Sequence, residues 1–470
     1  MSALLILFAT AIVVLFAGLT KQRNLLQPIA LGGTLLALGV TGFEVFSGST
    51  TSSDGTPTGL NGMYASMFQF DGYALAFSLV ALLATALILG LSAWGFRQLN
   101  DTLGDNYGLI LFSVCGALCL FSFTNMTMLF LGIEILSIPL YVLAGSRRSD
   151  LSSNEAALKY FLMGAFATGI FLFGTALVYG ATGTFDLAGI SSAISDGRHS
   201  AGMLHVGILL ILVGLSFKIS AVPFHFWAPD VYTGSPNLVT TFMATVVKTA
   251  GFAALYRLFS LGFGPAIEFW AIPVAAIAAL TMTVANLTAL FQQEFKRMMA
   301  YSSISHAGYL LLAVLAAGQA GSAGAILLYV LTYSIATICA FGCYIAVSEQ
   351  NLDDSISAFN GLGKKNAFLA AVMAVSMLSL AGIPPTAGFF GKYFVFSTAF
   401  QQYPWLVVLA VVNSAISIYY YFKVIIAMYF SRDENAYEVS IPASVRWVSV
   451  ICLLLIALLT IAPGSFYGLI

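Results

Sequence analysis

The chain has 470 residues, of which 60% are hydrophobic and 8% are charged, and its formal net charge is −1. An ordinary soluble domain carries about 25% charged residues, and the mean hydropathy here is +0.94. These values exclude a soluble globular protein and predict that most of the chain lies in a membrane.

A membrane-spanning helix needs about 20 apolar residues, and about fourteen such runs fit this sequence. We therefore predict an all-α polytopic membrane protein with about 14 transmembrane helices. The first run has neither a charged n-region nor a small-residue cleavage site, so we expect a retained span and not a signal peptide. The run 385–430 is expected to hold the remainder of one helix and then a full span. The runs are 2–20, 27–47, 72–95, 107–123, 125–145, 156–180, 203–222, 237–259, 268–290, 298–318, 322–347, 366–383, 385–430 and 446–466.

Lysines and arginines fall unevenly between the predicted loops. Cytoplasmic loops of membrane proteins carry an excess of these residues. One set of alternate connections holds only Arg198 and Arg257, whereas the other set holds eleven of the 18 basic residues. The bias predicts that the 21–26 loop is cytoplasmic and that both termini lie outside. The eleven are Lys21, Arg23, Arg97, Arg147, Arg148, Lys296, Arg297, Lys364, Lys365, Arg432 and Arg446.

Five lysines remain, and all of them fall within apolar runs: Lys159, Lys218, Lys248, Lys392 and Lys423. A charge at the centre of a bilayer costs about 2.5–3.5 kcal/mol on insertion scales, so it needs a partner or a wet cavity. A lysine near a helix end can instead extend its ammonium to the interface. We expect this of Lys423, and Lys159 fits either interpretation. Lys248 and Lys392 lie too deep, and we predict a function for both.

Glu134 is the acidic residue that is clearly central in a predicted span. A lone buried carboxylate would stay protonated, so Glu134 needs a cation, and the candidates are Lys159, Lys218 and Lys248. An ion pair buried only for stability compares poorly with a well-packed apolar pair. The pattern therefore favours proton chemistry.

Two of the four histidines lie among these charges. His225 follows Pro223, and His306 is central in the stretch YSSISHAGYLLL. Histidine titrates near neutrality and can pass a proton between its two nitrogens. We predict a functional role for both and a structural role for His199 and His205.

The cysteines give no sign of a metal site. Cys115 and Cys119 are four residues apart, as are Cys339 and Cys343. This spacing places each pair on one helix face, where thiols behave mostly as small hydrophobic groups. We predict no metal, no iron–sulfur cluster and no disulfide in this chain.

Proline interrupts two of the predicted spans at similar places. Pro223 in SFKISAVPFHFWAPD and Pro384-Pro385 in LSLAGIPPTAGFFGK follow serine and small residues and precede aromatic residues. Proline breaks a helix, and a broken helix at membrane depth is tolerated where it is buried in protein or lines a wet cavity. Paired interruptions indicate an inverted repeat of the kind found in transporters. We predict one membrane domain with three helices in 1–106, two inverted five-helix repeats in 107–261 and 262–430, and a last helix in 431–470.

Three long motifs resemble one known family. PFHFWAPDVYTGSPNLVTTFMATVVKTAGFAALYRL, QQEFKRMMAYSSISHAGYLLL and LSLAGIPPTAGFFGKYFVF are similar to the antiporter-like membrane subunits of respiratory complex I. Within that family the subunit N branch of NADH–quinone oxidoreductase matches best. The resemblance covers nearly the whole chain and is strongest between Gly108 and Phe396. It implies a multi-pass protein of the bacterial inner membrane.

The resemblance assigns roles to the buried charges. It implies that Lys218 on the first broken helix pairs with Glu134, that Lys248 is the central lysine, and that Lys392 is the terminal lysine. Some sibling subunits carry glutamate at the last position, so lysine there favours the subunit N branch. The remaining members of the implied polar axis are His306, His225, Lys159 and Asp230.

The family works as one part of a proton-translocating enzyme, which other membrane and peripheral subunits complete. FMN, iron–sulfur clusters and quinone are expected in those partners, and no cofactor, metal or nucleic acid is expected on this chain. The sequence has no phosphate-binding glycine loop and no dinucleotide fingerprint. Two alternatives remain open: a subunit of a multisubunit Na⁺/H⁺ antiporter, which needs no redox partner, and a structural membrane subunit.

Overall fold

The computed structural model describes residues 1–20, 23–47, 59–96, 102–351, 354–431 and 440–469. Lys21, Arg97 and Arg432, which contributed to the topology argument, lie outside these ranges. Within them the chain is almost entirely helical, and β-pairing is limited to three isolated bridges between loops. The predicted all-α membrane fold is confirmed.

The first part of the chain, through the first broken helix, forms α1 (Ser2–Gly18), η1 (Arg23–Leu25), α2 (Leu26–Ser47), α3 (Gly59–Met63), α4 (Gly72–Gly95), α5 (Leu103–Ser122), α6 (Met126–Ala144), α7 (Leu151–Thr182), α8 (Leu187–Ser195), α9 (Ala201–Ile219) and α10 (Trp227–Gly234). The centre of the chain forms α11 (Asn237–Phe242), η3 (Met243–Val247), α12 (Lys248–Arg257), η4 (Leu258–Gly262), η5 (Gly264–Ala266), α13 (Ile267–Leu290), α14 (Phe295–Leu315) and α15 (Ser322–Asn351). The last part forms η6 (Ile356–Phe359), α16 (Leu362–Lys365), α17 (Ala367–Ala381), α18 (Ala387–Phe400), α19 (Pro404–Phe430), α20 (Ala443–Ile461) and α21 (Pro463–Tyr467).

Twelve helical stretches of the described chain are long and apolar enough to cross a membrane. Two shorter apolar helices, α1 and α17, join them. The connection between α7 and α9 contains the short helix α8, which the sequence analysis did not predict.

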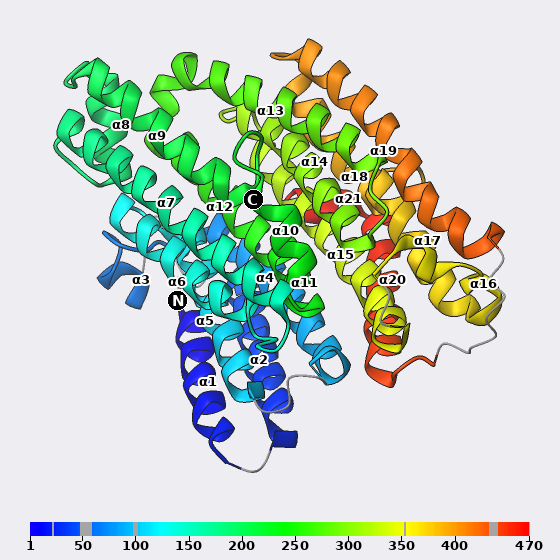
Figure 1. Ribbon diagram of the computed structural model, residues 1–470. Coiled ribbons are helices and arrows are strands. Elements are labelled where there is room, and N and C mark those ends of the chain that lie inside the picture. Colours follow the sequence, from blue (N-terminus) through cyan, green and yellow to red (C-terminus); the bar gives the residue numbers. More distant parts are fainter. Residues whose placement is uncertain (21–22, 48–58, 97–101, 352–353, 432–439, 470) are drawn as a thin grey trace.

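The helices are arranged side by side, with the first half of the chain next to the second (Figure 1). The stretch α11–η3–α12 and the long helix α15 are surrounded by protein along their spans. By contrast, α2, α7, α13, α19 and α20 keep one face outward. Side chains on α12, α14 and α15 can therefore interact in the centre of the bundle, away from lipid.

Close approaches between small residues bring the helices that carry the charges together. A Cβ on Gly116 of α5 would lie 2.3 Å from the backbone nitrogen of Leu136 on α6. A Cβ on Gly174 of α7 would lie 2.8 Å from the carbonyl oxygen of Gly207 on α9. Larger residues cannot fit at these crossings, which is the usual reason for small residues between membrane helices. The α5–α6 and α7–α9 pairs thereby fix the positions of Glu134 and Lys218.

Both predicted helix breaks are present. α9 ends at Ile219, where Ser220 adopts a left-handed conformation (φ 61°), and α10 begins only at Trp227. α17 ends at Ala381, Gly382 is left-handed (φ 78°), and α18 begins at Ala387. Pro223 lies in the first gap, and Pro384 and Pro385 lie in the second. The interruptions predicted from proline are confirmed.

Backbone groups freed by the first break find new partners. The indole nitrogen of Trp227 donates to the carbonyl oxygen of Phe217 at 3.0 Å. The backbone nitrogen of Val222 donates to Oγ1 of Thr281 at 3.0 Å. Leaving a backbone polar group unpaired in an apolar interior costs on the order of several kcal/mol of free energy. These bonds therefore stabilise a break at membrane depth.

Candidate functional site

Three of the five lysines in the predicted spans are buried within the bundle, and Lys296, in the first turn of α14, is buried as well. Lys218, Lys248 and Lys392 expose 6%, 3% and 5% of their surface. Such low exposure means that none of the three extends its ammonium group to the membrane surface, as the depth of Lys248 and Lys392 predicted. Each must therefore be solvated by protein atoms.

Lys218 lies in the last turn of α9 and points toward α6. Its Nζ donates to Oγ of Ser137, and Ser137 stands one helical turn after Glu134. Glu134 itself is half-buried and accepts a hydrogen bond of 2.9 Å from Oγ1 of Thr168 on α7. In the described part of the chain no ion pair joins Glu134 directly to Lys218. Glu134 and Ser137 share a face of α6, and Lys218 on α9 contacts this face through Ser137.

Aromatic rings separate Lys218 from the next lysine. Its ammonium lies 5.9 Å from the ring centroid of Tyr160, whose ring stacks on Trp227 at 4.6 Å. Trp227 in turn contacts Tyr232 edge-on at 6.3 Å. The negative face of an aromatic ring attracts a cation, so this wall contributes to holding Lys218 in place.

Lys248 is held by α14. Its Nζ donates to both the carbonyl oxygen and Oγ of Ser303. The π-helical turn Met243–Val247 comes directly before Lys248, and such turns inside α-helices are frequent at functional sites. The sequence analysis did not predict it.

His306 follows Ser303 by one turn of α14 and is hydrogen-bonded at both ring nitrogens. Nδ1 lies 2.6 Å from the hydroxyl of Tyr329 on α15, and Nε2 lies 3.0 Å from the hydroxyl of Tyr421 on α19. The Tyr421 hydroxyl also bonds Ser302. A hydroxyl both donates and accepts, so this series can pass a proton by exchanging hydrogen bonds.

Lys392 completes the series on α18. Its Nζ donates to the carbonyl oxygen of Ala381 at 2.7 Å and to Oγ of Ser414 at 2.8 Å. The ammonium also lies 5.3 Å from the ring centroid of Tyr309. A cavity of about 10 Å³ has both His306 and Lys392 in its lining, which is about the space that one water molecule needs.

Neither Lys248 nor Lys392 has a carboxylate within ion-pairing distance in the described residues. Their ammonium groups contact only hydroxyl and carbonyl oxygens. A neutral amine can keep bonds of this kind, because the hydroxyl can turn to donate. The surroundings of both lysines therefore accommodate the charged and the neutral form.

Two predicted members of the axis lie elsewhere. Lys159 contacts Glu155 at 2.6 Å and Asp230 at 2.7 Å, and Arg297 contacts Asp230 at 2.9 Å. The side chains of Lys159, Asp230 and Arg297 are each about one third or more exposed. These four residues form a surface ionic cluster, away from the buried hydroxyls that hold Lys248 and His306.

His225 does lie beside the first break. It is buried, its ring contacts that of Phe226 at 4.5 Å, and its Nδ1 has no partner in the described residues. The structure thus gives it a place next to Pro223 but no bond to Lys218 or Lys248.

Sequence reasoning missed the groups that solvate the charges. These are Ser137, Ser302, Ser303, Tyr329, Ser414 and Tyr421. The motif YSSISH carried a usable signal for the two serines near His306, because polar residues crowd an otherwise apolar helix. Tyr329 and Tyr421 carried none, because a tyrosine in an apolar run normally belongs to the core.

The family assignment follows from residues 124–417, which match the family described as NADH:quinone oxidoreductase/Mrp antiporter, TM. The match covers both broken helices and the buried lysines Lys218, Lys248 and Lys392. The chain belongs to this family. The resemblance predicted from the three motifs is confirmed.

Curated relatives of this family match over most of their length. A protein of Trichlorobacter lovleyi named NADH-quinone oxidoreductase subunit N is 44% identical over 84% of this chain and 80% of its own. A protein of the same name from Flavobacterium psychrophilum is 38% identical over 99% of this chain and 98% of its own.

Solved structures of the family share the fold. A chain of respiratory complex I from Thermus thermophilus, solved with bound aureothin, superposes with a TM-score of 0.82 at 36% identity, covering 99% of this chain and 98% of that one. A chain of the Mrp complex from Dietzia sp. has a TM-score of 0.84 at 19% identity, covering 100% of this chain and 96% of that one. The second likeness concerns the fold alone.

Proposed function

We propose that this chain is the subunit N type of membrane subunit in an NADH–quinone oxidoreductase and that it translocates protons. The proposal rests on a buried series of hydrogen bonds. Lys248 bonds Ser303, Tyr421 bonds both Ser302 and His306, and His306 also bonds Tyr329. Lys218 and Lys392 lie on the two sides of this series. Relatives at 38% and 44% identity bear the name of that subunit. We propose that the redox chemistry, with FMN, iron–sulfur clusters and quinone, takes place in partner subunits.

The first step is a change in the distance between Glu134 and Lys218. A nearby carboxylate stabilises the protonated form of a lysine, whereas burial favours the neutral amine. Lys218 bonds Ser137, one turn from Glu134, so a small movement of α6 changes the charge beside the lysine. A signal from a neighbouring subunit that moves Glu134 away makes Lys218 release its proton.

Uptake occurs at the end of the bundle where Arg147, Ser235, Lys296 and Glu349 gather, called here the basic end. From this end Asn237, Thr241 and Thr245 repeat every four residues and lead to Lys248. Oδ1 of Asn237 and Oγ1 of Thr337 are buried without a protein partner among the described residues. Buried polar atoms are nearly always paired, so these are places where water binds.

The proton then moves sideways from Lys248 through Ser303 and His306 to Lys392. Ser303 lies next to Ser302 and one turn before His306 on α14, but no direct bond joins it to either among the described residues. The step from His306 to Lys392 also has no direct bond, and the cavity that both residues line bridges it. The proton is then released from Lys392, beside the second broken helix. We assign the basic end to the cytoplasm of a bacterial inner membrane, and both termini to the outside, because short cytoplasmic loops carry an excess of lysine and arginine.

Two alternatives predict other behaviour. A subunit of a Na⁺/H⁺ antiporter exchanges ions without NADH. A structural subunit tolerates loss of its buried lysines, and normal turnover of a Lys218→Ala, Lys248→Ala complex would favour it.

The assignment is tested by gentle purification of the tagged chain from native membranes. We expect co-purification of flavin, iron–sulfur proteins and inhibitor-sensitive NADH:quinone reduction. An eluate with other hydrophobic subunits but with neither flavin nor NADH oxidation would instead indicate the antiporter, and sodium-driven exchange would then be measured.

The mechanism is tested by Glu134→Gln, which removes the charge and keeps the shape. We expect a severe loss of NADH-driven proton pumping in a complex that still assembles. Glu268→Gln is the matched control, because Glu268 is an exposed carboxylate in the first turn of α13. Normal pumping by the Glu134→Gln complex would overturn the proposed coupling of this residue to Lys218.

A further inference from the structure

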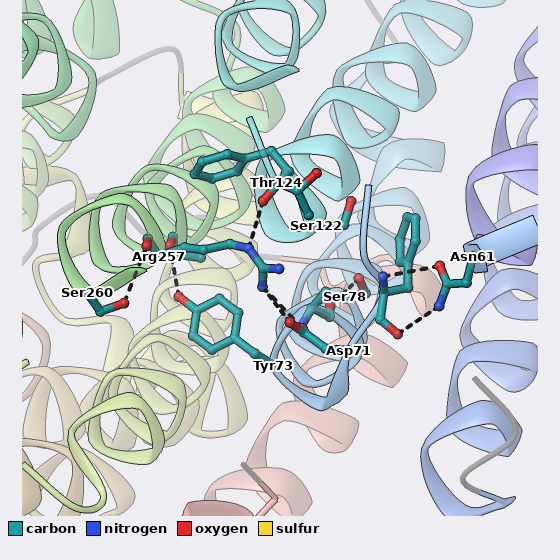
Figure 2. A network of polar contacts seen from close by, with 12 residues as sticks. Asn61, Asp71, Tyr73, Ser78, Ser122, Thr124, Arg257 and Ser260 are labelled. Atoms are coloured by element: carbon teal, nitrogen blue, oxygen red, sulfur yellow. Dashed lines mark hydrogen bonds and ion pairs between the residues drawn. The ribbon is translucent and has the colours of Figure 1, made fainter. Parts of the chain in front are cut away.

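Arg257 is buried at the end of α12 that lies opposite to the basic end. The sequence analysis counted it as a loop charge, but only 3% of its side chain is exposed. Its Nε donates to the carbonyl oxygen of Phe123 at 2.9 Å, and its NH1 lies 2.9 Å from Oδ2 and 3.1 Å from Oδ1 of Asp71 (Figure 2). The side chain of Asp71 is 31% exposed. The carboxylate of this pair thus faces the outside of the bundle, and the guanidinium faces the inside.

Several segments hold the pair rigidly. Asp71 is the N-cap of α4 and accepts from the backbone nitrogen of Ala74 at 2.8 Å. Phe123 follows the last residue of α5, and its backbone pairs with Phe68. In Figure 2 the guanidinium lies between the α4 terminus and the α5–α6 connection. Three helices therefore converge on one cation.

Between Lys248 and Arg257, α12 carries polar side chains only directly beside the two cations, at Thr249 and Tyr256. Its side chains from Ala250 to Leu255 are all buried and carry no polar atom. Nine residues of helix separate the two cations by about 14 Å. The neighbouring rings of Tyr73, Phe77 and Phe121 pack together at 4.6 Å and 5.9 Å.

The hydroxyls around this segment are already engaged. Tyr73 donates to the carbonyl oxygen of Ala253 at 2.8 Å, and Tyr256 bonds Ser322 at 2.7 Å. Ser78 and Ser122 each bond a carbonyl of their own helix. The other half of the same span carries Asn237, Thr241 and Thr245, with unpartnered polar atoms nearby. Polar side chains thus recur every four residues from the basic end to Lys248, whereas the segment from Ala250 to Leu255 has none.

We propose that Arg257, held by Asp71, is a proton barrier that closes this end of the first repeat, so that a proton on Lys248 can leave only toward His306. The inference rests on the proposed function. A guanidinium remains charged in proteins and has five donors but no acceptor, so it cannot take up and pass on a proton. Its positive charge also repels an approaching proton, as arginine does in pores that exclude protons.

The barrier is tested in sealed membrane vesicles that contain the whole complex, with the amount of assembled complex matched. The first readout is the decay of an imposed pH gradient in the absence of NADH, which does not depend on the redox assignment. The second is the pH gradient that NADH builds. We expect Arg257→Gln to speed the passive decay several-fold and to lower the NADH-driven gradient, while NADH:quinone reduction continues.

Three further variants separate a barrier from a merely structural clamp. Arg257→Lys keeps a cation, and Asp71→Asn keeps both the guanidinium and a good helix cap. Vesicles with either variant should therefore hold the imposed pH gradient as long as the wild type does. Arg257→Gln combined with Lys248→Ala should lose the leak, because the leak runs through Lys248.

The proposal is overturned if Arg257→Gln vesicles hold the gradient as long as the wild type. It is also overturned if the leak persists in the double variant, because the opening would then bypass Lys248. If the complex with Arg257→Gln does not assemble, the same vesicle measurements are made on Asp71→Asn instead. A leak there would show that the ion pair and not the cation closes this end, and reduced pumping without a leak would make Asp71 an exit group instead.

Discussion

The ammonium group of Lys392 donates to the carbonyl oxygen of Ala381 across the second helix break, at 2.7 Å. Ala381 is the last residue of α17. The last carbonyls of a helix have no partner within it, and the helix dipole places partial negative charge there. Lys218 lies in the last turn of α9, before the first break. The two lysines stand on opposite sides of their prolines in the sequence, yet both are associated with the end of the first half-helix.

Replacing Lys392 by methionine tests this position. Methionine keeps the length of the side chain but leaves the carbonyl of Ala381 and the hydroxyl of Ser414 without their donor. A hydrogen bond to a charged group is worth about 1.5–3 kcal/mol, so we expect a loss of stability of that order. We also expect proton pumping to fall at least about tenfold, because the thioether of methionine cannot take up and release a proton as an amine does. NADH-driven pH gradients and thermal unfolding of the complex measure the two effects.

Lys423→Met is the matched control for this variant. Lys423 also lies in an apolar helix and donates to the carbonyl oxygen of Gln292 at 2.8 Å, but it is only partly buried. We expect pumping within about twofold of the wild type, since exposed charge interactions contribute about 0–1 kcal/mol. Equal losses in both variants would mean that Lys392 acts only as a structural cation.

Ser303→Ala tests how Lys248 is held. The change removes the hydroxyl acceptor and keeps the backbone carbonyl that Lys248 also contacts. We expect reduced pumping, less severe than in Lys248→Ala, because one of two bonds remains. Ser305→Ala is the control, since Ser305 is buried in the same motif and donates to the carbonyl oxygen of Ser302, whereas Lys248 bonds Ser303. Equal pumping by the two serine variants would contradict a role for Ser303 in the relay.

Tyr421→Phe tests the connection between Ser302 and His306. It removes the one hydroxyl that bonds both residues and leaves the ring in place. We expect a several-fold loss of pumping with little loss of packing. Tyr419→Phe is the control, because Tyr419 lies on the same helix but is exposed. If Tyr419→Phe lowers pumping as much as Tyr421→Phe does, the relay does not run through Tyr421.

The sequence was sufficient to predict the membrane fold, the two breaks and the burial of Lys248 and Lys392. Each of these follows from a strong local signal: a long apolar run, a proline within a span, or an isolated charge far from the helix ends. The family match over residues 124–417 bears out the three long motifs.

The hydrogen-bond partners of the buried lysines could not be predicted from the sequence. Lys218 bonds Ser137 across 81 positions and Lys248 bonds Ser303 across 55, and only the packing of α6, α9, α12 and α14 brings them together. Arg257 was misjudged for the same reason. Its helix ends beside Asp71, 186 positions away, so a residue that resembled a loop charge is buried.

The surface ionic cluster gives a last prediction, because the sequence analysis placed Lys159 and Asp230 in the polar axis. Ion pairs with side chains about one third exposed contribute about 0–1 kcal/mol and are screened by salt. We therefore expect Asp230→Asn to lower stability by no more than that amount and to leave pumping within about twofold of the wild type. Lys159→Met should behave in the same way. If Asp230→Asn instead abolishes pumping as Glu134→Gln is expected to do, the cluster is part of the proton path, and uptake passes through Lys159 before it reaches the buried lysines.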